Sequence, residues 1–183
     1  MRKEIRLSGS GGQGLITAGI ILAKAAALYD QKNAVQSQSY GPEARGGATR
    51  CDVLISSQPI YYPKVQVANA MVALTQQALD RYLQYLQPGA LLLTDAHYVK
   101  TTGRIDAEHY SLPMYENVMD TFGKPQVFNI CVMGALLQLT GVVAPAALEK
   151  NLAERFAPQF QENNKKALDM GIELAKKAAS DPC

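Results

Sequence analysis

The N-terminal half alternates short apolar runs with longer helical patterns. Residues 5–8 predict a strand, residues 9–14 a glycine-rich turn, and residues 15–28, rich in alanine and free of proline, a helix. A strand, a glycine turn and a helix in this order begin an α/β unit. Further along the chain, the pattern predicts strands over 34–39, 49–55, 68–74 and 90–94 and a helix over 76–86 closed by Pro88-Gly89.

The C-terminal third is predicted to be helical. Residues 126–139 are apolar nearly all round, so this helix should be buried in the fold or in an interface. Pro145 takes the favoured first position of a second helix. The last helix carries an apolar stripe made of Phe160, Leu168, Ile172, Leu174 and Ala175. Between these two regions, residues 96–112 have a weak hydrophobic pattern, which predicts one short strand near Tyr110.

These patterns together predict a three-layer α/β/α fold with a mostly parallel central sheet and a helical C-terminal third. Cys51, Val53 and Ile55 should share one face of their strand. The loop before that strand is short enough for an antiparallel pair, which would make the sheet mixed. No linker or repeat divides the sequence, so residues 1–183 are expected to form one domain.

Charge and cysteine usage narrow the function classes. The chain has 18 basic and 16 acidic residues, which is too even to favour nucleic acid or an anionic membrane as the main partner. No apolar stretch approaches the roughly 20 residues that span a bilayer. Cys51, Cys131 and Cys183 form no Cys-x-x-Cys motif, so no metal site is predicted, and a reducing, cytoplasmic location is expected.

The turn Gly9-Ser10-Gly11-Gly12-Gln13-Gly14 fits the pattern Gly-x-Gly-x-x-Gly between a strand and a helix. Glycine permits a tight turn and a close approach, and the N–H groups at the helix start can face an anion. A dinucleotide site needs an acidic residue after the second strand, whereas Asp30 comes too early and Glu43 too late. The alternative is that these glycines only allow tight packing of strand on helix.

A second polar loop, residues 37–47, should lie at the same edge of the sheet. Arg45 could pair with a phosphate or carboxylate, or simply with Glu43 in the turn. Asp95, His97 and His109 are better explained by a cap, a surface position or a hydrogen bond, so no catalytic residue is predicted. The predicted ligand-binding residues are Gly9, Gly11, Gly12, Gln13, Gly14, Ser39, Tyr40, Gly41, Arg45 and Gly46.

The two loops together, with residues 60–65 and 86–90, resemble the gamma subunit of 2-oxoacid:ferredoxin oxidoreductases, and the run Ser39–Gly47 resembles the 2-oxoglutarate branch. The likeness extends from Arg6 to about Ile172. It implies CoA-dependent oxidative decarboxylation of a 2-oxoacid to an acyl-CoA, with reduction of ferredoxin. It also implies alpha, beta and delta partner subunits that hold thiamine diphosphate, magnesium and iron–sulfur clusters, while the gamma subunit helps to shape the access of coenzyme A.

Two other readings stay open at this point. The chain could be an independent nucleotide- or phosphate-binding α/β enzyme that uses the glycine turn, although the missing acidic residue argues against this. It could also be a non-enzymatic binding or scaffold domain. The resemblance predicts instead that the isolated chain is colourless and inactive and that it binds partner subunits.

Overall fold

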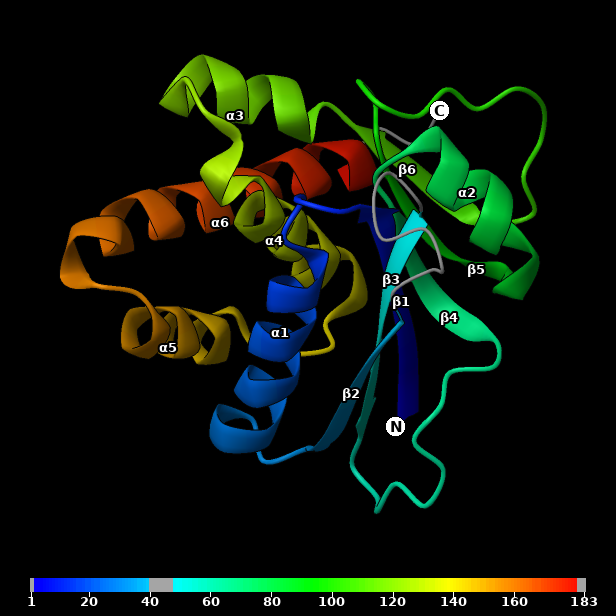
Figure 1. Ribbon diagram of the computed structural model, residues 1–183, viewed down its shortest axis with the longest axis horizontal. Helices are drawn as coiled ribbons and strands as arrows, with labels where there is room; N and C mark the ends of the chain where they lie inside the picture. Colours follow the sequence, from blue (N-terminus) through cyan, green and yellow to red (C-terminus); the bar gives the residue numbers. More distant parts are fainter. Residues whose placement is uncertain (1, 40–47, 181–183) are drawn as a thin grey trace.

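Within residues 2–39 and 48–180, the part of the chain that the computed structural model describes, six strands form one mixed sheet in the order β2-β3-β1-β4-β5-β6 (Figure 1). The strands are β1 (Arg2–Ser10), β2 (Asn33–Ser39), β3 (Ala48–Ser56), β4 (Ala68–Ala73), β5 (Leu86–Asp95) and β6 (Glu108–Leu112). The α-helices are α1 (Leu15–Tyr29), α2 (Gln76–Tyr82), α3 (Met114–Phe122), α4 (Phe128–Thr140), α5 (Pro145–Arg155) and α6 (Pro158–Ser180). Two short 3₁₀ helices are η1 (Leu83–Tyr85) and η2 (Pro125–Val127).

The sheet is parallel on one side and antiparallel on the other. Strands β1, β4, β5 and β6 pair in parallel, whereas β3 pairs antiparallel with both β1 and β2. The prediction of a mixed sheet is therefore confirmed, with β3 as the strand that reverses direction. The ends of the parallel strands still meet at one edge, where the glycine turn follows β1.

One face of the sheet, here called the helical face, is covered by α1, α4 and α6, with α5 packed outside them (Figure 1). Cys51, Val53 and Ile55 of β3 all point into this cluster, as their alternation predicted. Helix α4 is buried over residues 128–137 because the sheet lies on one side of it and α6 on the other. Its all-round apolar pattern is thus explained within the fold.

The opposite face, called the α2 face, has a much thinner cover. Helix α2 packs there on Met71 and Leu92, and the β3–β4 connection covers Leu54 at the other end. The α/β/α layering is present, but its second layer is this one short helix together with connecting segments (Figure 1). Arg6 and Asp52 also lie on this face, almost fully buried.

Several predicted boundaries were wrong. The helix expected over 76–86 ends at Tyr82 and continues only as η1, because Leu86 already pairs with Ala68 in the sheet. The helix expected from residue 126 begins at Phe128, after η2. Helix α3 falls in a segment where no element was predicted. The first difference shows tertiary pairing overriding a local helical pattern, whereas the start of α4 is delayed by the 3₁₀ turn that begins at Pro125.

The last helix also differs from its predicted stripe. Its buried positions are Asn164, Ala167, Leu168, Gly171 and Ala175, whereas Phe160 is 45% exposed. The small residues face α4 because the two helices lie very close together: a Cβ at Gly171 would collide with the carbonyl of Cys131. None of the helices in the described ranges is long and apolar enough to cross a bilayer.

Candidate functional site

The glycine turn leaves the carboxyl end of β1 and leads into α1. Gly12 has a φ of 92° and Gly14, the N-cap of α1, a φ of 72°, in the left-handed region that favours glycine. The side chain of Gln13 folds back over the turn: its Oε1 accepts from the Ser10 N–H at 2.8 Å, and its Nε2 donates to the Leu74 carbonyl at 3.3 Å. Gln13 therefore closes the turn with its own amide.

The four glycines of the turn have different roles. A Cβ at Gly9 would collide with the Gln13 side chain, and one at Gly14 would come within 2.7 Å of Asn129 Nδ2, so packing explains these two. At Gly11 and Gly12 an added Cβ would meet nothing within 4 Å. Gly11 also has no positive φ that would require glycine. Packing of strand on helix therefore accounts for only part of the motif.

A cavity of about 290 Å³ lies against this turn. Its lining residues are Gly12, Gln13, Gly14, Tyr98, Tyr115, Pro125, Gln126, Phe128 and Asn129. Helix α1 begins at its rim without a side-chain cap, because Gly14 has no side-chain oxygen to accept from the first-turn N–H groups. The cavity thus joins an uncapped helix start to an aromatic wall.

The aromatic wall consists of Tyr98, Tyr115 and Phe128, with His97 beside it. The ring centroids of Tyr98 and Tyr115 are 4.8 Å apart, and those of Tyr115 and Phe128 are 5.7 Å apart, both edge to face. Burial, and then hydrogen bonding with Tyr115, raises the pKa of the Tyr98 hydroxyl. These rings line the cavity together with the polar backbone of the glycine turn.

Asp95, at the end of β5, holds the segments that carry this wall. Its Oδ2 accepts from the Tyr115 N–H at 2.8 Å, and its Oδ1 accepts from the His97 N–H at 3.0 Å. Its pKa is raised because burial outweighs these hydrogen bonds, which by themselves lower it. The interpretation of Asp95 as a turn or helix cap is confirmed: its bond to the His97 N–H, two residues on, closes a turn, and Tyr115 lies in the first turn of α3.

Sequence reasoning missed the wall and the far side of the cavity. Tyr98 and Tyr115 lie in or beside the stretch of weakest pattern, so nothing marked them. Asn129 carried a usable signal, because it is a polar residue inside the apolar run of α4. Its Nδ2 donates to the Gly14 carbonyl at 3.2 Å and so joins α4 to the start of α1.

The second predicted loop is described only at its ends. Ser39 closes β2, while Tyr40, Gly41, Arg45 and Gly46 lie outside the described residues. In the sheet, Ser39 is opposite Arg50, and Ala48 is opposite Ser10. The flanks of this segment therefore reach the same edge as the glycine turn, as expected, and the binding roles of its residues stay predictions.

The histidines and cysteines have structural surroundings. His97 lies 3.4 Å from Glu116 at the surface, and His109 lies 2.9 Å from Thr94 Oγ1 with its pKa lowered by burial. Burial raises the pKa of Cys51 to about 11 and of Cys131 to about 12, which keeps both thiols protonated. Among the described residues, no group of three or more histidine, cysteine or acidic side chains could hold a metal ion.

Comparison with known proteins identifies the family. The family model for pyruvate ferredoxin/flavodoxin oxidoreductase matches residues 4–174. The 2-oxoglutarate synthase subunit KorC of Methanocaldococcus jannaschii is 46% identical over 178 residues, which cover 96% of this chain and 95% of that protein. The gamma subunit of a keto/oxoacid ferredoxin oxidoreductase from Geobacter sulfurreducens is 43% identical, with a TM-score of 0.89 over 97% of this chain and 98% of its own.

The same fold also occurs inside a longer chain. The 2-oxoglutarate:ferredoxin oxidoreductase of Magnetococcus marinus matches with a TM-score of 0.88 at 23% identity, and the match covers 96% of this chain but 31% of that one. The resemblance seen in the two loops and the α/β architecture are both confirmed by these matches. The chain therefore belongs to the pyruvate ferredoxin/flavodoxin oxidoreductase family.

Proposed function

We propose that the cavity at the glycine turn receives part of coenzyme A in the 2-oxoglutarate:ferredoxin oxidoreductase to which this chain contributes the gamma subunit. Four relatives named 2-oxoglutarate synthase subunit KorC, between 34% and 46% identical over nearly the whole chain, support the substrate. The Magnetococcus enzyme is described with 2-oxoglutarate, coenzyme A and succinyl-CoA bound. The chain works as one subunit of this oxidoreductase.

The observation that carries the proposal is the cavity that Gly12 and Gly14 line at an uncapped helix start, opposite an aromatic wall, with open space beside the adjoining Gly11. A diphosphate group fits the uncapped start of α1, because the first-turn N–H groups and the helix dipole favour an anion. An adenine ring fits the aromatic wall, because a tyrosine ring can stack on a flat π system. A cavity of about 290 Å³ suits a part of coenzyme A rather than the whole.

In this proposal each residue binds or positions, and none performs a chemical step. The backbone at Gly11 and Gly12 faces the diphosphate, while Tyr98 and Tyr115 hold the adenine and exclude water from one side of it. Asp95 fixes both tyrosine segments through its bonds to the His97 and Tyr115 N–H groups. Coenzyme A, when bound, supplies the thiol that takes the acyl group. Ser39, Tyr40, Gly41, Arg45 and Gly46 are proposed to contribute from the neighbouring loop.

We further propose that alpha, beta and delta subunits carry thiamine diphosphate, magnesium and the iron–sulfur clusters, and that ferredoxin meets the complex through them. The thiols of Cys51 and Cys131 support this division, because both are buried and held protonated, while a metal ligand must be a thiolate. Two buried, reduced cysteines also suit the proposed cytoplasmic location.

The test replaces Gly11 by alanine and by valine in the assembled enzyme. Since the added atoms enter open space, the melting temperature should change by no more than about 2 °C. The KM for coenzyme A should rise about threefold for Gly11→Ala and about tenfold or more for Gly11→Val, with the KM for 2-oxoglutarate unchanged. Thr101→Val, at an exposed site, is the control.

Two results would contradict this function. An unchanged KM for coenzyme A in Gly11→Val would remove the glycine turn from the coenzyme site. Oxidation of 2-oxoglutarate by the isolated chain would contradict its role as a dependent subunit and would favour an independent enzyme. The Arg45→Ala variant tests the second loop in the same assay, and weaker use of coenzyme A with intact assembly is expected.

A further inference from the structure

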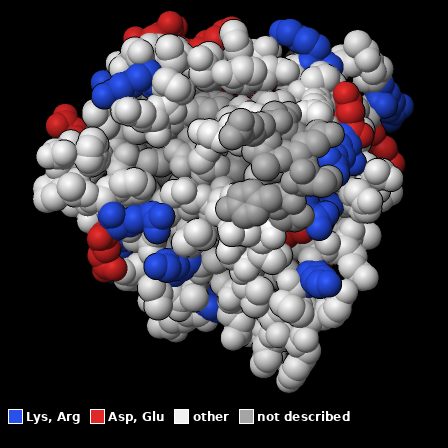
Figure 2. Space-filling model, in the orientation of Figure 1, with Lys and Arg blue, Asp and Glu red and all other residues white. Residues whose placement is uncertain are grey.

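A second cavity, of about 300 Å³, lies where α6 begins, beside η2 and the end of α3. Its lining residues are Phe122, Lys124, Gln126, Val127, Phe156, Gln159, Phe160, Asn163 and Asn164. It is distinct from the cavity at the glycine turn, although Gln126 lines both. Figure 2 shows that the left edge of the molecule, where α5 leads into α6 in Figure 1, is largely white. On the face shown, this end of the molecule is therefore mostly uncharged.

Aromatic rings from three helices form the apolar part of the second cavity. Phe122 ends α3, Phe156 follows the last residue of α5, and Phe160 lies in the first turn of α6. Phe160 belongs to the apolar stripe predicted for the last helix, yet it is exposed rather than packed in the core. Its ring is instead one wall of this cavity, together with the other two. The cavity therefore offers an aromatic surface to a ligand, and its volume is at the lower end for ligand sites.

The polar part of the second cavity favours negative charge. Lys124 lines it, and the Lys166 ammonium lies 5.8 Å from the centre of the Phe122 ring, beside one wall. None of the described residues that line the cavity is acidic, and the first turn of α6 carries no acidic residue either. The positive end of a helix dipole favours an anion in the same sense as the two lysines. An anionic group is therefore the expected head of a ligand here.

Asn164 supplies an independent sign of a ligand. Its side chain lines the cavity, the residue is only 4% exposed, and its Nδ2 has no hydrogen-bond partner among the described residues. A buried donor without an acceptor costs free energy, so it calls for an explanation. The terminal torsion of an asparagine is broad, which allows the amide to turn toward an oxygen atom in the cavity that it lines. A ligand with an acceptor oxygen would provide the missing partner.

We propose that the second cavity binds a small aromatic carboxylate, with its ring among Phe122, Phe156 and Phe160 and its carboxylate at Lys124 and Asn164. One lining ammonium group and neutral amides match a single negative charge. Phosphate sites usually bring an arginine fork or a glycine-rich loop, and neither occurs among the described residues that line this cavity. The inference goes beyond the proposed coenzyme A site and does not depend on it.

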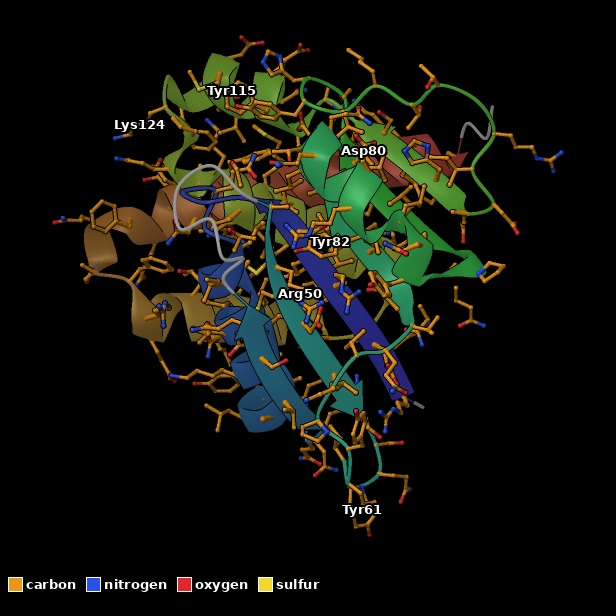
Figure 3. All side chains as sticks on the ribbon, turned by 45° about the vertical axis from the view of Figure 1, so that its right-hand side comes forward. Arg50, Tyr61, Asp80, Tyr82, Tyr115 and Lys124 are labelled. Carbon is orange, nitrogen blue, oxygen red and sulfur yellow. The ribbon has the colours of Figure 1, made fainter. Side chains whose placement is uncertain are left out.

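The test titrates 3-phenylpropionate into the full chain by calorimetry, and saturable binding with a dissociation constant of about 1 mM or below is expected. The amide 3-phenylpropanamide, which has nearly the same shape without the charge, should bind about fivefold more weakly or worse. Lys124→Gln should weaken binding of the carboxylate about fivefold and leave binding of the amide unchanged. Lys64→Gln is the matched control at another exposed lysine. Figure 3 shows Tyr61, in the same connection as Lys64, at the opposite end of the molecule from Lys124.

A second variant separates a binding role of Asn164 from a structural one. Asn164→Leu keeps a similar volume and removes the unpaired donor, so its melting temperature should not fall. Its affinity for 3-phenylpropionate should nevertheless fall about tenfold, because the carboxylate loses a donor in a buried site. An asparagine with a purely structural role would show the reverse, a lower melting temperature with unchanged affinity, and that result would contradict the proposal.

Three further results would overturn the proposal. The first is no saturable binding of 3-phenylpropionate up to about 10 mM, and the second is equal affinity in the wild type, Lys124→Gln and Asn164→Leu. The third is a loss of binding in the assembled enzyme, which would assign the cavity to contact with a partner subunit. The KM for coenzyme A should be unchanged in Lys124→Gln. A raised KM there would make this cavity part of the coenzyme site and would reject a separate ligand.

Discussion

The two faces of the sheet are stabilised in different ways. On the helical face, α1, α4 and α6 bury a large apolar cluster, and glycines allow α4 and α6 to approach closely. On the α2 face, a single short helix covers the sheet (Figure 1), and smaller apolar clusters surround a buried ion pair between Arg6 and Asp52. The helical face therefore depends on apolar area and steric fit, whereas the α2 face combines smaller apolar clusters with one buried pair of charges.

The two kinds of interaction have different consequences for the segments that they hold. Apolar packing needs no special partner and tolerates exchanges of similar volume. A buried ion pair is costly to form, because both charges lose their water, and replacing it by apolar residues is often neutral or stabilising. Arg6 also donates to the Val65 carbonyl and so holds the connection between β3 and β4 at that residue. The polar network thus fixes a surface segment that apolar contacts alone would hold less firmly.

The largest expected effect comes from breaking the ion pair. Asp52 accepts from Arg6 Nε at 2.8 Å and from Nη2 at 3.0 Å, so Asp52→Ala would leave a buried guanidinium without its counter-charge. We expect a loss of about 3–5 kcal/mol in the free energy of unfolding, measured with urea. A loss below about 1 kcal/mol would contradict the contrast between the two faces.

The double variant Arg6→Met/Asp52→Leu is the matched control, because it removes both charges and keeps most of the volume. It should recover most of the stability that Asp52→Ala loses, as buried pairs replaced by apolar residues usually do. The Val65 carbonyl would still lose its donor. We therefore expect residues 57–67 to show faster amide hydrogen exchange in the double variant than in the wild type, at nearly equal global stability.

The next effect tests steric fit on the helical face. Gly171 of α6 lies against α4, where an added Cβ would collide with the carbonyl oxygen of Cys131, and Gly134 of α4 is equally close to Leu168 of α6. Gly171→Ala should therefore cost about 1–3 kcal/mol, although alanine is the better helix former. Glu162→Ala, on the exposed side of the same helix, should change the unfolding free energy by less than about 0.5 kcal/mol. A stabilised Gly171→Ala would show that the helices can separate freely.

The two faces also differ in how far the sequence predicts them. Local composition marked the elements of the helical face: α1 is rich in alanine, α4 is a continuous apolar run, and Pro145 marks the start of α5. On the α2 face the sequence predicts a helix that continues through Leu86, because nothing local indicates that this residue pairs with Ala68 in the sheet. The partnership of Arg6 with Asp52 was not predicted either, since it joins residues far apart in the chain.

At the candidate site, the glycine turn could be predicted because its constraint is local. Positive φ at Gly12 and Gly14 requires glycine whatever surrounds the turn. The aromatic wall could not be predicted, because Tyr98 and Tyr115 come together only when Asp95 binds the N–H groups of both segments. Loops set by backbone chemistry are visible in a sequence, whereas walls built by long-range contacts need the structure.

The smallest effect concerns the pH dependence of the α2 face. His109 on β6 points to this face, beside Thr94, and burial lowers its pKa from the usual 6.5. Because the folded state disfavours the charged ring, its contribution is fully present above pH 6.5 and is lost as the pH falls from there toward the folded-state pKa. His109→Gln should therefore lose less stability than the wild type between pH 7 and pH 5 in urea unfolding. His97→Gln, at an exposed histidine, is the matched control. If His109→Gln lost as much stability as the wild type over this interval, the acid sensitivity would belong to carboxylates elsewhere and not to this edge of the α2 face.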